Sequence, residues 1–267
     1  MKTRRYHAII SLRRRLRQLL ILPVLGLILS AGSTAVRGEE IVNSLGMRLA
    51  GISDQVWMCL HETRRQDFAA FVEAGGRPVP DPSFEQTGEH PVVNVSWEDA
   101  LRFCLWLTES ERAKGTIRMN QFYRLPTESE WMLAAGFENT GAQDFTRARQ
   151  LVFPWGESWP PPPNSGNFGE SLGTEAFRNT APVRSFSPNT NGFYDMSGNV
   201  WEWCADPFEG ASDIRVLKGG SWRMHEPSRL ALNRKIGNAC GLRLPTYGFR
   251  VVLVTENTVT KGDASEF

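Results

Sequence analysis

The chain has few cysteines and no close pair of them. Its four cysteines, Cys59, Cys104, Cys204 and Cys240, are widely spaced among 267 residues. They form neither a CxxC motif nor a cluster with histidine, which argues against a structural zinc site. One disulfide would be compatible with an exported protein, but the sequence assigns no pair. Glycine-rich phosphate-binding loops, Ser/His/Asp spacings and internal repeats are absent as well.

The sequence also lacks a long hydrophobic run. Its longest apolar stretch, residues 19–32, is shorter than the roughly 20 residues that span a membrane. Seven Lys and Arg side chains precede it, and Ser33-Thr34-Ala35 follows it as a small-residue cleavage pattern. This order predicts a signal peptide over residues 1–35, and so an exported protein, periplasmic or secreted, with no stable membrane span after cleavage. An uncleaved anchor is the alternative, and no cysteine follows the run to make a lipoprotein.

An excess of positive charge is missing too. The whole chain has 30 basic and 29 acidic side chains. The first 35 residues hold seven of the basic ones and no acidic one, so the mature chain has a net charge near −6. That balance excludes the basic surface on which nucleic-acid binding depends.

Local patterns predict three short helices. A Ser or Thr followed three residues later by an acid or amide is typical of a helix N-terminus. The pattern occurs at Thr63, Ser96 and Thr127, each before apolar residues at helical spacing. The glycine pair at 75–76 predicts the end of the first of these helices.

Over residues 138–191 the apolar residues recur with neither helical nor strand spacing, and this segment includes four consecutive prolines. Two strands are predicted after it, over residues 215–218 and 247–254, before a polar tail at 255–267. We therefore predict an α+β fold, as a single compact domain with little regular secondary structure.

An acid pair flanks a predicted turn. Asp195 and Glu202 lie seven residues apart around Ser-Gly-Asn. Calcium prefers six to eight oxygen ligands, and two carboxylates with the carbonyls of a turn could supply part of such a cage. A tight turn with solvated acids is the alternative.

Seven motifs in order resemble the formylglycine-generating enzyme (sulfatase-modifying factor) family, over residues 41–254. They are NVSWEDA at 94–100, RLPTESEW at 124–131, FPWG at 153–156, APV at 181–183, GFYDMSGNVWEW at 192–203, KGGSW at 218–222 and GFR at 248–250. The resemblance implies a variant C-type-lectin fold, with the domain over residues 36–254. It is less specific for activity, because members of one fold family diverge in function.

The resemblance also implies structural calcium. The positions that match one family site are the Asp195 side chain, the Gly198 and Val200 carbonyls, and Glu202. The positions that match a second site are Asn167, the Phe168 carbonyl, Glu175 and the Phe177 carbonyl. The family more often has Asp where Glu175 stands, and the spacing from Asn167 is short.

The catalytic feature of the family is missing. Its active members use O₂ and Cu(I) to oxidise a substrate cysteine, and two cysteines after the Gly-Gly-Ser-aromatic motif hold the copper. In this sequence the two positions are Met224 and Arg229. Because Cu(I) prefers soft thiolates, copper is not expected here and no catalytic residue is assigned. Met224 with His225, or Cys240 alone, are the alternative ligands.

The loop at 219–234 could still bind something. Five of its residues could line a polar cleft, in which arginine would pair with carboxylate, sulfate or phosphate: Trp222, Arg223, His225, Arg229 and Arg234. A solvated loop is the alternative. The function expected is an accessory module that binds an envelope protein, a peptide or a glycan. The alternatives are another oxidase or maturation enzyme on this scaffold, up to an authentic sulfatase activator.

Overall fold

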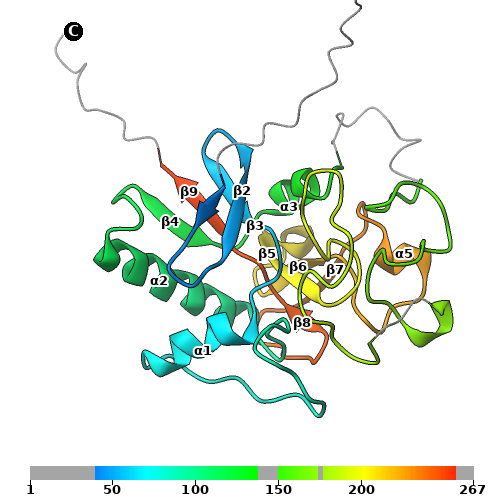
Figure 1. Ribbon diagram of the computed structural model, residues 1–267, viewed down its shortest axis with the longest axis horizontal. Coiled ribbons are helices and arrows are strands. Elements are labelled where there is room, and N and C mark those ends of the chain that lie inside the picture. The colour runs from blue at the N-terminus through cyan, green and yellow to red at the C-terminus, as the bar shows by residue number, and fades with distance from the viewer. Residues whose placement is uncertain (1–39, 138–149, 174–176, 257–267) are drawn as a thin grey trace, which may run out of the picture. The chain divides into compact units, whose positions relative to one another are not determined.

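A computed structural model of the chain describes residues 40–137, 150–173 and 177–256 (Figure 1). The chain divides into two units, Met1–Thr34 and Ala35–Phe267. All described residues belong to the second unit. The predicted signal peptide and residues 257–267 of the predicted tail lie outside the described residues. No helix within the described ranges is long and apolar enough to cross a membrane.

A five-stranded antiparallel sheet joins the two ends of the domain. Its strands, in spatial order, are β1 (Ile41–Val42), β2 (Arg48–Ser53), β3 (Val56–Cys59), β9 (Val252–Thr255) and β4 (Gln121–Arg124). The last strand of the domain therefore pairs with β3 near its beginning (Figure 1). β9 also extends one residue into the predicted tail, because Thr255 pairs with Gln121.

A second sheet has four strands. Their spatial order is β7 (Ile236–Ala239), β6 (Ile214–Lys218), β5 (Trp201–Pro207) and β8 (Tyr247–Gly248). The pairs β7–β6 and β6–β5 are antiparallel, and β5–β8 is parallel. β6 confirms the strand predicted at 215–218.

The prediction of one continuous strand over residues 247–254 is wrong, because this segment forms two separate strands. Tyr247–Gly248 belongs to the four-stranded sheet and Val252–Thr255 to the five-stranded sheet. Between them, the carbonyl of Phe249 accepts a hydrogen bond from the Thr63 amide, and that of Val251 accepts one from the amide of Cys59 at the end of β3. The chain crosses from one sheet to the other here, which the local pattern of apolar residues does not reveal.

Three helices lie where the sequence predicts them: α1 (Arg65–Glu73), α2 (Trp97–Lys114) and α3 (Glu128–Ala134). Ser96 and Thr127 cap α2 and α3 as expected. The predicted cap at Thr63 is wrong by one residue, because Arg64 precedes the helix and Asp67 accepts hydrogen bonds from its amide and its guanidinium. Asp67 takes the role expected of Gln66 because the helix begins one residue later, which makes Asp67 its third residue.

The segment without periodicity contains little regular structure. Within its described parts, residues 150–173 and 177–191, the only helix is the single turn η1 (Glu170–Leu172). Two further short helices are η2 (Phe208–Gly210) and α5 (Pro227–Leu230). Large aromatic side chains such as Trp131, Trp203, Phe103 and Phe249 are fully buried. The expected loop-rich α+β domain is therefore confirmed.

Candidate functional site

The Ser-Gly-Asn turn at 197–199 is a junction of three distant segments. The Asn199 amide donates to the Asn167 carbonyl (2.8 Å), and the Gly198 amide donates to the Gly219 carbonyl (2.8 Å). Gly198 has φ of +92°, and a Cβ atom there would lie 2.4 Å from the Asn167 carbonyl oxygen. Only glycine fits both the conformation and the space. The two segments in which calcium is expected thus contact each other directly.

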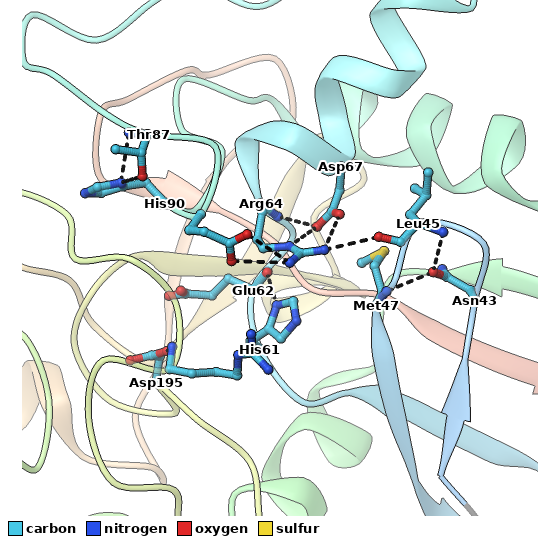
Figure 2. A network of polar contacts seen from close by, with 12 residues as sticks. Asn43, Leu45, Met47, His61, Glu62, Arg64, Asp67, Thr87, His90 and Asp195 are labelled. Carbon is cyan, nitrogen blue, oxygen red and sulfur yellow. Dashed lines mark hydrogen bonds and ion pairs between the residues drawn. The ribbon is translucent and has the colours of Figure 1, made fainter.

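Three acids and one arginine are buried beside this turn. Glu62 and Glu202 are fully buried, Asp195 is 6% exposed, and the only arginine among them is Arg250, which is also fully buried. Figure 2 shows the Glu62 side chain extending toward the loop that carries Asp195. Glu62 accepts hydrogen bonds from the Asn199 side chain (2.8 Å) and from the Val200 amide (3.3 Å).

The Glu202 carboxylate is already surrounded by donors. Arg250 donates to it in a bidentate pair, from Nε to Oε2 and from Nη2 to Oε1, both at 2.6 Å. The indole Nε1 of Trp131 also donates to Oε2 (2.7 Å). A buried charge of this kind is stable only when it is paired and hydrogen-bonded. Glu202 therefore does not fit a cation ligand unless this pair opens.

The other two acids have unusual proton affinities. Burial raises the pKa of Asp195 to about 6, although the Arg184 amide and the Arg250 charge oppose the rise. Burial also raises the pKa of Glu62 well above its usual value, and the neighbouring Asp195 and Glu202 charges raise it further. Arg250 is the only one of the compensating arginines that is fully buried beside the three carboxylates, so the cluster favours a bound proton or another cation.

Two buried oxygens in the predicted calcium sets have no hydrogen-bond partner: Asp195 Oδ1 and Asn167 Oδ1. Buried polar atoms are normally satisfied, so each of these oxygens fits a cation ligand. Phe168 is buried and Phe177 half-buried, while Glu175 lies outside the described residues. Within the described part of the chain, no group of three or more His, Cys, Asp or Glu side chains could hold a metal ion. Calcium, which also accepts amide and carbonyl oxygens, stays a prediction.

The loop at 219–234 begins with two glycines in left-handed conformations. Gly219 and Gly220 have φ of +94° and +79°, and a Cβ at Gly220 would lie 2.6 Å from the Leu230 side chain. The loop therefore folds tightly back against α5. Trp222 is 8% exposed, donates to the Pro245 carbonyl (3.3 Å) and contacts Phe84 edge-on.

The two positions that correspond to the family's copper ligands have different environments. Met224 is half-buried and packs on the apolar core, while its carbonyl accepts from the Gly169 amide (2.8 Å). Arg229 is exposed on α5. His225, the alternative partner of Met224, is exposed and lies 3.6 Å from the Glu226 carboxylate. The structure thus gives Met224 a packing role.

The four cysteines are all free thiols, and none is at those positions. Cys59, Cys104 and Cys204 are buried, and Cys240 is half-buried. Burial raises the pKa of Cys59 to about 12 and raises the pKa of Cys104 and Cys204 as well. The three buried side chains are therefore neutral thiols at physiological pH and behave as small apolar groups.

The other predicted binding residues remain on the surface. Arg223 is exposed and lies over the Trp222 ring, 4.6 Å from its centroid. Arg229 and Arg234 are exposed, and neither has an ion-pair partner in the described ranges. Of the five predicted binding residues, the structure thus brings Trp222 and Arg223 into contact.

Sequence reasoning missed two members of the buried cluster, Glu62 and Arg250. Nothing in the sequence near Glu62 marks it as different from a surface acid. Its partner Asn199 is 137 residues away in the chain. Arg250 belongs to the quoted GFR motif, so that motif was the available signal, but its partner Glu202 was assigned to calcium.

Comparisons with known proteins agree on a family. The model of the Sulfatase-modifying factor enzyme 1-like domain matches residues 35–255. A formylglycine-generating enzyme of Thermomonospora curvata is 34% identical over 172 residues, which cover 55% of this chain and 49% of that protein. The inactive C-alpha-formylglycine-generating enzyme 2 of Bos taurus is 39% identical over 140 residues, covering 50% of this chain and 39% of that protein. The chain thus matches half or less of the length of these curated relatives.

Solved structures show the same fold. PvdO from Pseudomonas aeruginosa has a TM-score of 0.59 at 21% identity, covering 78% of this chain and 81% of that one. CarF has a TM-score of 0.54 at 26% identity, covering 75% and 87%. The expected variant C-type-lectin fold of formylglycine-generating enzymes is thereby confirmed. The relatives include proteins named as active and as inactive enzymes, and the chain belongs to the Sulfatase-modifying factor enzyme 1-like domain family.

Proposed function

We propose that this protein is an accessory module that binds a ligand or partner on the formylglycine-generating enzyme scaffold, without copper-dependent cysteine oxidase activity. One observation carries the proposal: Met224 and Arg229 stand at the two copper positions. A thioether that packs on the core and an exposed guanidinium do not replace two thiolates. The positive charge of Arg229 would also repel a copper ion.

The remaining thiols support the same function. Three of the four cysteines are buried neutral thiols, and copper binding would first have to deprotonate them. Cys240 is half-buried and is a single thiol, whereas the family's chemistry uses two. A relative named as inactive, with 39% identity, is consistent with loss of the oxidase reaction within the family.

The alternative function is an oxidase or maturation enzyme on the same scaffold. The 34% identity to a formylglycine-generating enzyme favours it. In that case the half-buried Cys240 would supply a thiol to the site. The variant Cys240→Ser tests this alternative, because it leaves Met224 and Arg229 unchanged.

The ligand of the accessory module is proposed to bind the loop at 219–234. Arg229 and Arg234 present exposed guanidinium groups without ion-pair partners in the described ranges, and Arg223 lies on the Trp222 ring. This combination suits an acidic group next to an apolar or sugar surface. An envelope protein, a peptide or a glycan with carboxylate or sulfate groups fits that description. Such a partner agrees with the export proposed from the N-terminal pattern.

Copper titration tests the loss of the oxidase. Purified wild-type protein is titrated with Cu(I), and oxygen consumption is followed with a cysteine-containing sulfatase peptide. We expect no stoichiometric copper binding and no peptide-dependent oxygen consumption. The double variant Met224→Cys/Arg229→Cys restores two thiols at the family positions and should gain copper binding. Wild-type protein that binds copper and oxidises the peptide would refute the proposal.

We further propose that calcium stabilises the domain through Asp195 and Asn167, whose buried oxygens lack partners. When it is bound, calcium would supply a positive charge beside the buried acids. A ligand that binds only the folded state stabilises it by about 2.7 kcal/mol at 100 times its Kd. Chelator should therefore lower the Tm of the wild type but not that of Asp195→Ala. The exposed Asp213→Ala is the control, and a wild-type Tm that ignores chelator would exclude calcium.

A further inference from the structure

We propose that a groove along α1 binds an amphiphilic organic cation, meaning an apolar body that ends in an amine. The groove has a volume of about 330 Å³. It is lined by residues of α1, by residues 78–81, which follow the helix, and by residues 92–93. Figure 1 shows this segment running back along the helix. The volume lies at the lower end of the range for small-molecule sites, about 300–1,000 Å³. Its lining includes none of the residues at the family's copper positions and none of those proposed to bind calcium.

The walls of the groove are mainly apolar. Its apolar lining includes Phe68 and Val72, one helical turn apart on α1, together with Val79 and Val92. Two prolines flank Val79 and have no amide N–H to donate. The first two amides of α1, those of Arg65 and Gln66, donate to the carbonyls of His90 and Gly88, so they are already paired. The groove therefore offers hydrophobic contact but few hydrogen bonds to the body of a ligand.

The charges at the two ends of the groove differ. At one end the Arg65 guanidinium is neutralised, because Nη2 pairs with Asp81 (3.0 Å) and Nη1 donates to Gln86 (3.3 Å). At the other end Glu73 is exposed and has no ion-pair partner in the described ranges. Among these charged lining residues the balance is negative, and the unpaired charge is at the Glu73 end. A ligand cation is complementary to it and an anion is not.

The length of the groove limits the ligand. Arg65 and Glu73 are eight residues apart on a helix, which corresponds to about 12 Å. An alkyl or aryl body of that length places its amine next to Glu73 and its apolar end next to the Arg65–Asp81 pair. An added peptide strand is less suitable, because the prolines beside Val79 leave that wall without the amides that strand pairing needs.

Calorimetric titration with a series of n-alkylammonium ions, from butyl to octyl, tests the proposal. Each added methylene should tighten binding about fourfold until the groove is full. The matching n-alkyl carboxylates should bind more weakly at every length. Equal binding of amines and carboxylates, or affinity independent of chain length, would overturn the proposal.

Two variants with matched controls locate the site. Glu73→Gln should weaken ammonium binding about two- to fivefold and remove the preference over carboxylates, whereas the exposed Glu109→Gln on α2 should not. Ala69→Trp should fill the groove and abolish binding, while Ala74→Trp, which is outside the lining, should retain it. Unchanged binding to Ala69→Trp, with native circular dichroism, would refute the location. None of these outcomes depends on copper or on the loop at 219–234.

Discussion

Acid should destabilise this protein through His61. The ring is 1% exposed, and its Nδ1 lies 2.7 Å from the Glu62 carbonyl, to which it donates in the neutral form. Burial lowers the pKa of His61 to about 3, with smaller contributions from Arg64, Arg184 and Arg250. The unfolded chain has no such burial, so there His61 titrates near its usual pKa of about 6.5.

The two pKa values determine the sign and size of the effect. Between pH 6.5 and 3 the unfolded state binds a proton on His61 and the folded state does not. The free energy of unfolding therefore falls as pH falls, by about 1.4 kcal/mol for each pH unit. From pH 6.5 to pH 5 the loss is about 2 kcal/mol, a large share of the 5–15 kcal/mol typical of a domain.

Other buried groups oppose this effect, so one variant must isolate it. The raised pKa values of Asp195 and Glu62 make the folded state bind protons more tightly, which increases stability as pH falls. The pKa of His90 is lowered by burial and acts in the same direction as that of His61. The total pH dependence is thus a sum of opposite contributions, and only the difference between wild type and a His61 variant is informative.

Urea unfolding at pH 7.5, 6 and 5 measures that difference. His61→Gln keeps a donor for the Glu62 carbonyl but cannot titrate, so it should lose about 2 kcal/mol less than the wild type between pH 7.5 and 5. The exposed His225→Gln is the control and should follow the wild type. If wild type and His61→Gln lose stability in parallel, the ring is not held neutral by burial, and the reasoning is wrong.

Three further changes test the packing around the site. Arg250→Met should cost about 3–5 kcal/mol in urea unfolding because it leaves Glu202 buried without its partner, and adding Glu202→Leu should recover much of that loss; no recovery would contradict the buried pair. Gly198→Ala should cost on the order of 3 kcal/mol, since alanine is strained at this φ and its Cβ meets the Asn167 carbonyl, and a neutral effect would refute the close approach. Ser96→Ala should cost about 1 kcal/mol through loss of the α2 cap, measured in the same assay, and an unchanged midpoint would show that the cap is redundant.

Local elements of the fold could be predicted because their contacts are local. The caps of α2 and α3 join residues three apart, so Ser96 and Thr127 identify both helix starts. The start of α1 lies one residue after the predicted one, and its first amides, those of Arg65 and Gln66, donate to the distant carbonyls of His90 and Gly88. The strand at 247–254 was wrong for a similar reason: two different sheets compete for its halves.

The buried cluster could not be predicted, because its contacts join distant segments. Glu202 looked like a calcium ligand beside a turn, yet it pairs with Arg250, 48 residues later in the chain. Glu62 has no distinguishing local pattern, and its buried carboxylate accepts a hydrogen bond from Asn199, 137 residues away. Burial raises the pKa of Asp195 and Glu62, and burial is a property of the assembled fold.

From the order of residues alone came the family, the loop-rich domain and the absence of thiols at Met224 and Arg229, because motifs and residue identities need no coordinates. Only the tertiary structure shows that Glu202 pairs with Arg250, that one oxygen each of Asp195 and Asn167 has no hydrogen-bond partner, and that a groove forms along α1. Each of these depends on which segments come together and exclude water, and water exclusion sets both the proton affinities and the hydrogen-bond partners of buried groups.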